Sequence, residues 1–467
     1  MNETRAKYYA WSVVFASWLA VFCLFGYRAT FAILKGSMAV TLGWTSAEVT
    51  LGYSLMMVFY AVTAYVSGMM LDRWGTKPVY AVAAVLGCLG FVCTAQVDTR
   101  LAYLFSFGLL GGIANGMLWV TSTVSVRKWF IGQSYATMWG FAFAGGPMAQ
   151  FVLARMVQPT LSVSQAKLDH AIRPLVADGA SLGPKQMALA IAAKLKDPTI
   201  LAMGEVKEAL QGLDRAWRHQ MTLLGVIVLF ALAVAVVAAK QPPEHYEMKP
   251  FGAIPPAPGA AAVEPEWSTA QAFSRYAIWA AILTFLTSMM GEFLIWTQVV
   301  SYWTQDVGYT LEKAAKIYAT IGLVGIFSMP IMGKIADKVV QSSGLETKGR
   351  KRMLILGPFT GVLACALLLA SPRSDFFAYL SSVAFAIYWA VVPGGVVGYT
   401  GAIYGRKTLG KIWGLSTMIV MAIGPFLGSY VGGLLNDISG RYTYSIYFAL
   451  GSFVVSILVA STLPLEA

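Results

Sequence analysis

Long runs without a charged residue dominate this chain of 467 residues. Twelve stretches contain at most one charged side chain each, and their apolar residues cover all faces of a helix rather than one stripe. The stretches are 8–27, 49–71, 78–97, 101–126, 129–154, 220–239, 276–305, 317–333, 353–372, 376–405, 412–436 and 442–465. A hydrocarbon core of about 30 Å requires about 20 helical residues, which every stretch approaches or exceeds. We therefore expect twelve transmembrane helices.

The composition supports an all-α membrane protein. Hydrophobic residues make up 57% of the chain and charged residues 12%, whereas soluble proteins carry about 25% charged residues. A barrel is not expected, because its strands need only about 10 residues of alternating polarity. The first stretch lacks a small-residue cleavage site, so we interpret it as a span and not a signal peptide. The four cysteines lie inside predicted spans, where packing is the expected role.

The basic residues are distributed unevenly between the two sides of the predicted membrane. With the N-terminus placed in the cytoplasm, cytoplasmic loops hold 18 of the 34 Lys and Arg residues and the short loops opposite hold six. Cytoplasmic loops of membrane proteins are enriched in these residues. We therefore predict a multi-pass protein of the cell (inner) membrane with both termini cytoplasmic. The formal charge of +12 then reflects the bilayer and not a nucleic-acid partner.

Two interruptions organise the twelve spans. Residues 241–267 contain seven of the 19 prolines, which predicts an extended cytoplasmic linker. The linker separates helices 1–6, in residues 1–159 and 220–240, from helices 7–12, in residues 268–467. The other interruption, residues 160–219, falls on the extracytoplasmic side between helices 5 and 6.

The 160–219 insert has the periodicity of short amphipathic helices. Its apolar residues recur at helical spacing around Leu168 and again around Leu210. Breaks between two or three helices are expected at 178–179, 183–184 and 197–198, where Gly or Pro follows Asp or Gly. Such an insert would either cap the outer mouth and offer a docking surface for a partner, or rest passively on the membrane.

A repeated motif relates the two halves. Gly68-Met-Met-Leu-Asp72-Arg73-Trp-Gly75-Thr-Lys77 follows the second span, and Gly333-Lys-Ile-Ala-Asp337-Lys338 follows the eighth. Duplicated six-span units are typical of transporters. The motif also resembles the cytoplasmic loop motif of the major facilitator superfamily. This resemblance implies two pseudo-symmetric six-helix bundles, in the major facilitator fold, and a gating role for Asp72, Arg73, Asp337 and Lys338 in closing the cytoplasmic side.

A narrower resemblance concerns the first span. The segment from Tyr27-Arg28 to Lys35, followed by Trp44-Thr-Ser-Ala-Glu48, resembles monocarboxylate transporters and implies that Arg28 binds substrate. The segment Arg127-Lys-Trp-Phe130 is similar to the equivalent junction of oxalate:formate antiporters. Other positions depart from these families. Gly325 stands where monocarboxylate transporters carry Asp, and Met329, before Pro330, stands where both families carry Arg. Ser416 stands where the antiporter carries Lys. Oxalate, which needs two cationic partners, is therefore disfavoured.

Two charged residues inside predicted spans suggest the chemistry. Arg28 lies about 20 residues into span one and Glu292 about 16 residues into span seven. An Arg at mid-bilayer costs about 2.5–3.5 kcal/mol, so it should face a wet cavity or an anion, with snorkelling to the interface as the alternative. A guanidinium can hold a carboxylate by two hydrogen bonds. A desolvated carboxyl favours its protonated form, so Glu292 is our candidate for proton coupling; the alternative is a structural partner of Arg28.

Aromatic and amide residues of the spans complete the predicted cavity, although packing alone could explain most of them. The candidate substrate-binding residues beside Arg28 are Tyr27, Phe31, Asn115, Gln298, Tyr388 and Trp389. Two further tryptophans, Trp119 and Trp296, belong to the same group.

The leading hypothesis is a secondary active transporter of a small organic anion, resembling a monocarboxylate carrier, that is proton-coupled and works by alternating access. An anion exchanger, a carrier of a zwitterion and a non-transporting membrane sensor remain alternatives. An enzyme is not expected, because the spans carry no His and the chain has no Gly-x-Ser-x-Gly motif or phosphate-binding loop. No cofactor, metal or catalytic residue is expected.

Overall fold

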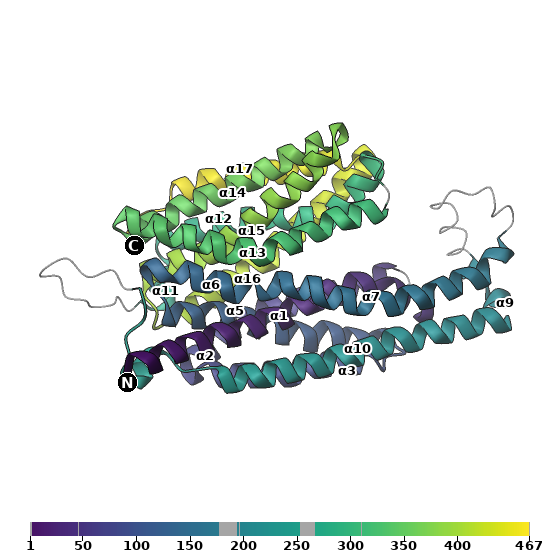
Figure 1. Ribbon diagram of the computed structural model, residues 1–467, viewed down its shortest axis with the longest axis horizontal. Helices are drawn as coiled ribbons and strands as arrows, with labels where there is room; N and C mark the ends of the chain where they lie inside the picture. The colour runs from purple at the N-terminus through teal and green to yellow at the C-terminus, as the bar shows by residue number, and fades with distance from the viewer. Residues whose placement is uncertain are drawn as a thin grey trace, which may run out of the picture.

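The protein is helical throughout the part of the chain described by the computed structural model, which comprises residues 2–44, 46–176, 194–195, 197–252, 267–309 and 311–466. In these ranges the only extended pairing is an isolated parallel bridge between Phe130 and Phe251. The helices form two bundles that lie side by side (Figure 1).

The first bundle contains the helices that precede the linker. They are α1 (Asn2–Leu42), α2 (Ser46–Trp74), α3 (Thr76–Thr94), α4 (Arg100–Tyr103), the π-helix η1 (Leu104–Leu110), α5 (Gly111–Trp129), the 3-10 helix η2 (Gly132–Ser134), α6 (Tyr135–Phe143), α7 (Gly145–Ile172) and α10 (Gly204–Ala238). The short α4, η1 and α5 follow one another without a break and together make one span, Arg100–Trp129.

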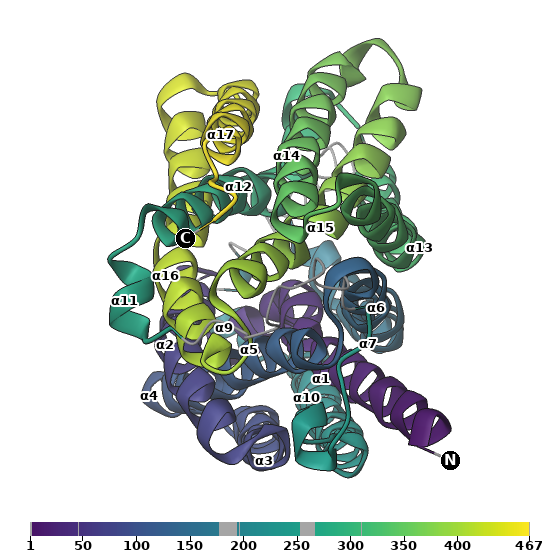
Figure 2. The same ribbon diagram turned by 90° about the vertical axis from the view of Figure 1, so that its left-hand side faces the viewer.

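The second bundle begins after the short α11 (Thr269–Phe273). Its helices are α12 (Tyr276–Ser301), the π-helix η6 (Tyr302–Asp306), α13 (Leu311–Ser343), α14 (Glu346–Ala370), α15 (Asp375–Tyr404), α16 (Leu409–Ser439) and α17 (Thr443–Ser461). Figure 2 shows both groups of helices end-on, with α15 between its own bundle and α5.

Eleven helices among the described residues are long and apolar enough to cross a membrane. They coincide with eleven of the twelve expected spans. The remaining expected span, 129–154, is formed by α6 and the first part of α7, which are separated only at Ala144. The twelve-span arrangement expected from the sequence is consistent with this structure.

Both chain ends lie at one end of the molecule (Figure 1). We call it the termini end; α2 and α13 end there, and α6, α14 and α16 begin there. We call the other end, where α7 and α10 project beyond the remaining helices, the insert end.

At the insert end, α7 and α10 extend from their spans into the segment 160–219 that was expected to form a separate insert. Helix α7 extends to Ile172, and α10 already begins at Gly204. Leu168, Ile172 and Val206 belong to a small separate apolar core that also packs against Val40 of α1. The 3-10 helix η3 (Arg173–Leu175) follows α7, and the expected break at 197–198 precedes α9 (Pro198–Leu201). The breaks expected at 178–179 and 183–184 lie outside the described residues.

The first part of the linker is attached to the termini end of the first bundle. The 3-10 helix η5 (Pro243–Tyr246) follows α10. Further on, Ile131 N–H donates to the Phe251 carbonyl (2.8 Å), and Phe251 N–H donates to the Trp129 carbonyl (2.9 Å). The Trp129 indole donates to the Gln241 carbonyl (3.0 Å). Residues 241–252 are therefore ordered against the loop between α5 and α6.

Close contact between the bundles relies on the glycines that open the two motif copies. A Cβ on Gly68 of α2 would collide with the Gly410 carbonyl of α16. In the second copy, a Cβ on Gly333 of α13 would collide with the Ala136 carbonyl of α6. Glycine allows helix backbones to approach closely, so these two positions set the separation of α2 from α16 and of α13 from α6.

We expect Gly68→Ala to lower the midpoint of thermal unfolding of the purified protein, because the added methyl group forces the two backbones apart. Overpacking of this kind costs about 1–3 kcal/mol. Gly433→Ala is the matched control, since nothing lies within 4 Å of a Cβ built at this helical glycine. A midpoint that falls equally in both variants would contradict the steric explanation.

Candidate functional site

Arg28 lies at the boundary between the two bundles. Helix α1 continues well past it to Leu42, so Arg28 is not at the end of its helix, where snorkelling would be easiest. Its guanidinium carbon is 5.1 Å from the ring centroid of Phe25 and 5.5 Å from that of Tyr60. The third ring, at 5.6 Å, is Phe293 of α12 in the second bundle. Aromatic faces attract a cation at these distances.

No carboxylate forms an ion pair with Arg28 in the part of the chain that the structure describes. The residue is half-buried. Aromatic rings contact the guanidinium group, but they do not supply a negative charge for its N–H groups. A desolvated cation in this state can gain strongly from a carboxylate that reaches it.

Glu292 immediately precedes Phe293 and is 4% exposed. Its Oε1 atom accepts a hydrogen bond of 3.4 Å from the Trp296 indole one turn along α12. Its Oε2 atom is buried and has no hydrogen-bond partner. Phe293, the next residue along α12, lies against the Arg28 guanidinium. The structure thus places Arg28 against the segment of α12 that carries Glu292, across the interface between the bundles.

Aromatic side chains connect the bundles beside this pair. Trp389 of α15 packs edge-on against Trp296, with ring centroids 5.2 Å apart. The same ring lies 5.5 Å from Phe25 and 6.0 Å from Phe143, both in the first bundle. Trp389 is 1% exposed. These rings form an apolar wall beside the polar ends of Arg28 and Glu292.

Of the other candidates in the first bundle, Tyr27 and Asn115 do not join this group. The Tyr27 hydroxyl donates to the Gly87 carbonyl of α3 (2.5 Å), and its ring stacks on Phe91. Asn115 donates to the Gly111 carbonyl of its own helix (2.7 Å), while its Oδ1 atom is buried without a partner. Phe31, one turn beyond Arg28, stacks on Tyr53 with centroids 4.8 Å apart.

In the second bundle, Tyr388 and Gln298 bond within their own half. The Tyr388 hydroxyl donates to the Ser288 carbonyl (3.0 Å), and Gln298 donates to the Ser429 carbonyl (3.3 Å). Three rings that surround Arg28 were not among the candidates: Phe25, Tyr60 and Phe293. Their residue type carries no distinguishing signal in spans that are rich in aromatic residues.

At the termini end, the acidic residue of each motif copy joins the two bundles. Asp72, at the end of α2, accepts a hydrogen bond from the backbone N–H of Lys411 in the first turn of α16 (2.9 Å). Its other oxygen accepts from the Lys128 ammonium group (2.9 Å). A carboxylate is stabilised at a helix N-terminus by the exposed N–H groups and the helix dipole.

Asp337 makes the equivalent contact from the second bundle. Its carboxylate accepts from the backbone N–H groups of Ala136 (2.9 Å) and Thr137 (2.7 Å) in the first turn of α6. The Thr137 hydroxyl adds a bond of 2.6 Å. Arg350 approaches the same carboxylate to 3.4 Å. Each bundle therefore places one aspartate on a helix N-terminus of the other.

The basic residues of the motif copies do not take part in these contacts. Arg73 and Lys338 are exposed, and Arg73 lies over the neighbouring Trp74 ring. Other basic residues form the ion pairs at this end. Besides Lys128 and Arg350, Arg127 of α5 pairs with Glu346 of α14 at 2.6 Å. Arg350 is also 3.2 Å from Glu346.

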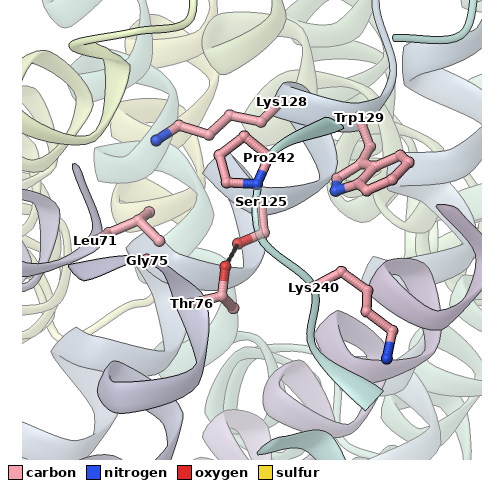
Figure 3. A pocket seen from close by; sticks show the side chains of 8 residues that line it. All are labelled: Leu71, Gly75, Thr76, Ser125, Lys128, Trp129, Lys240 and Pro242. Atoms are coloured by element: carbon pink, nitrogen blue, oxygen red, sulfur yellow. Dashed lines mark hydrogen bonds between the residues drawn. The ribbon is translucent and has the colours of Figure 1, made fainter. Parts of the chain in front are cut away.

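A small cavity at the termini end is enclosed by the first bundle and the linker. Figure 3 shows Thr76 and Ser125, whose hydroxyl groups are 3.0 Å apart, with Lys128, Lys240 and Pro242 around them. Its volume of about 10 Å³ is no more than one water molecule requires. This cavity is too small for a metabolite. The described residues also contain no cluster of His, Cys, Asp or Glu suited to a metal ion.

Comparison with known proteins identifies the family. The sequence profile of the Major Facilitator Superfamily matches residues 17–165 and 209–419. The chain belongs to this superfamily. Residues 166–208, which make up most of the 160–219 insert, fall outside the match. As a member of this family the protein is a membrane transporter of small molecules and not an enzyme.

Relatives of the chain include characterised and uncharacterised transporters. It is 19% identical to mouse monocarboxylate transporter 2 over 456 residues, covering 96% of this chain and 82% of that protein. It is 20% identical to the uncharacterised MFS-type transporter YhjX of Escherichia coli over 393 residues, covering 82% and 79%. The resemblance to the monocarboxylate branch noted in the sequence is consistent with the first of these.

Solved structures agree in fold. The transporter FucP in its outward conformation superimposes with a TM-score of 0.64 at 14% identity, covering 96% of this chain and 98% of FucP. The human organic anion transporter MFSD10 gives a TM-score of 0.61 at 15% identity, covering 97% and 99%. At these identities the agreement concerns the fold alone.

We expect Asp72→Asn combined with Asp337→Asn to shift the protein towards a state open at the termini end, because a neutral amide interacts less strongly with a helix N-terminus. Spin labels at the exposed positions Lys77 and Lys348 report the separation of the bundles at this end. Their distance distribution should gain a longer component in the double variant. Asp98→Asn, which removes an exposed carboxylate elsewhere, is the control. An unchanged distribution in the double variant would contradict the gating role.

Proposed function

We propose that the protein is a secondary active transporter of a small organic anion of the monocarboxylate type, coupled to protons and working by alternating access. The observation that carries this proposal is the position of Arg28. It is a half-buried guanidinium between the two bundles, without an ion pair in the described residues and beside a buried carboxyl group. A carboxylate ligand would supply the missing anion through two parallel hydrogen bonds.

The surroundings of Arg28 favour a small ligand with an apolar body. Phe25 and Phe293 flank the guanidinium, and the Trp296 and Trp389 rings lie beyond them. Ligand sites commonly combine a few polar groups with apolar walls. The single cation in this group matches one carboxylate better than two, which favours a monocarboxylate over a dicarboxylate.

Glu292 is our proposed coupling residue. Its Oε2 atom is buried and has no hydrogen-bond partner, and the next residue, Phe293, lies against Arg28. A carboxylate ligand on Arg28 would place a second negative charge near Glu292, and like charges favour protonation of one of them. Substrate binding and proton uptake would then reinforce each other, as symport requires. The proton on Glu292 and the bound substrate would then both be released on the other side when the two bundles alternate.

The proposed orientation places the termini end in the cytoplasm of a cell that carries this protein in its cell (inner) membrane. The excess of Lys and Arg in the loops at this end supports it. In that orientation Asp72 and Asp337 hold the cytoplasmic side closed. The insert end, with its separate apolar core, would be extracytoplasmic.

Exchange of one anion for another is the second candidate within transport, and the Arg28 site would serve it equally. A zwitterion is a further candidate. Its carboxylate would bind Arg28, and its ammonium group would have to reach the Oε2 atom of Glu292. A sensor without transport would bind at the insert. Removal of residues 160–219 distinguishes a sensor from a carrier. A carrier would still bind its ligand at Arg28 after the deletion, whereas a sensor would lose ligand binding.

Arg28→Ala should weaken binding of a short monocarboxylate about 10- to 100-fold, because a hydrogen bond to a charged group contributes about 1.5–3 kcal/mol. The measurement is a thermal-stability screen of purified protein with monocarboxylates, dicarboxylates, sulfonates and zwitterions. Arg28→Lys should recover part of the loss. Arg155→Ala is the matched control, since Arg155 is exposed and lies over Phe151. Equal stabilisation of wild type and Arg28→Ala by the same ligand would refute the proposed anchor.

Glu292→Gln should abolish acceleration of uptake by an inward proton gradient while anion exchange continues. Glutamine keeps the shape of the side chain and cannot take up the proton. Uptake into proteoliposomes with and without the gradient measures this, and Glu208→Gln, an exposed change on α10, is the control. If exchange is lost while the gradient response survives, the role given to Glu292 is wrong.

A further inference from the structure

A groove on the outside of the protein follows the contact between α6 and α13 at the termini end. Its volume is about 570 Å³, far larger than the cavity of Figure 3. One wall comes from α6 in the first bundle and the other from α13 in the second. The groove therefore spans the boundary between the two moving parts of the transporter.

The lining changes from apolar to basic along the groove. Phe141 of α6 and Pro330 and Ile331 of α13 line the part farther from the termini end. Phe141 is 41% exposed and Ile331 57% exposed. Lys334 and Lys338 line the part nearer the termini end. Residues 331, 334 and 338 share one helix face, and the distance from 331 to 338 is roughly 10 Å by helix rise.

The two lysines give this end of the groove a positive charge. Both are exposed, and neither forms an ion pair among the described residues. Asp337 also lines the groove, but its carboxylate is already bonded to two backbone N–H groups and the Thr137 hydroxyl, and Arg350 lies 3.4 Å away. Its charge is thus offset, and the lysines determine the field at the groove.

We propose that this groove is a binding site for one anionic phospholipid. The phosphate would lie between Lys334 and Lys338, and an acyl chain would cover Phe141 and Ile331. The order of polarity matches that of a lipid standing in a bilayer, with the charged headgroup at the membrane surface and the apolar chain below it. Lysine ammonium groups near the membrane surface attract anionic headgroups.

A lipid in this position contacts both bundles at the place where Asp337 holds α6. It would favour the state closed at the termini end, because separation of α6 from α13 divides the groove. This inference does not depend on the transported substrate, since no residue of the Arg28 group lines the groove.

Native mass spectrometry of the purified protein with phosphatidylglycerol or phosphatidylcholine tests the site. We expect Lys334→Gln combined with Lys338→Gln to reduce the fraction carrying one phosphatidylglycerol severalfold, with phosphatidylcholine binding unchanged. Lys348→Gln combined with Lys351→Gln removes the same charge at the start of α14 and should leave that fraction unchanged. Both pairs have part or all of the side chain in solvent, so folding should be preserved. Equal loss in both double variants, or loss in neither, would overturn the proposal.

A thermal-stability measurement distinguishes a lipid from a soluble phosphate. Phosphatidylglycerol should raise the unfolding midpoint of the wild type and leave that of Lys334→Gln/Lys338→Gln unchanged. Glycerol 3-phosphate at the same concentration should raise neither, because it cannot cover the apolar part of the groove. Equal protection of the wild type by glycerol 3-phosphate would show that the groove serves a soluble anion and that the lipid proposal is wrong.

Discussion

The carboxylates of Asp72 and Asp337 hold the conformation on which the rest of the structure depends. Each accepts hydrogen bonds from the first turn of a helix in the opposite bundle, α16 in one case and α6 in the other. The contact combines a full negative charge with the partial positive charge of a helix N-terminus. It needs close approach of the backbones, which Gly68 and Gly333 allow. The motif residues thus cooperate through geometry as well as charge.

The same interface between the bundles contains Arg28. The guanidinium contacts Phe25 and Tyr60 in its own bundle and Phe293 in the other. Arg28 is therefore sensitive to the relative position of the bundles, as a residue must be if it binds substrate differently in two states. Glu292 shares this sensitivity because it is adjacent to Phe293 and faces the same interface.

The sequence was sufficient to predict the fold, since charge-free runs give the spans, and its repeated motif singled out Asp72 and Asp337, which contact the opposite bundle. It was not sufficient to predict their partners. Lys128 and Arg350 both lie outside the motif copies in the sequence. Only the packing of the helices brings them close to Asp72 and Asp337. The adjacent residues Tyr27 and Arg28 were also both predicted to bind substrate, but their side chains point to different places. Tyr27 bonds to Gly87 within its own bundle, whereas Arg28 contacts Phe293 of the other bundle. A helix that is apolar on all faces does not reveal which side faces the cavity.

The charges at the termini end are arranged so that opening does not isolate an acid. Lys128 belongs to the same bundle as Asp72, and Arg350 to the same bundle as Asp337 and Glu346. When the bundles separate, each carboxylate loses its helix terminus but keeps a cation that travels with it. Arg127 likewise retains the ring of Tyr135, 4.9 Å away in its own bundle. Since an unpaired buried charge is costly, a separation of the two bundles would leave neither aspartate without a nearby cation.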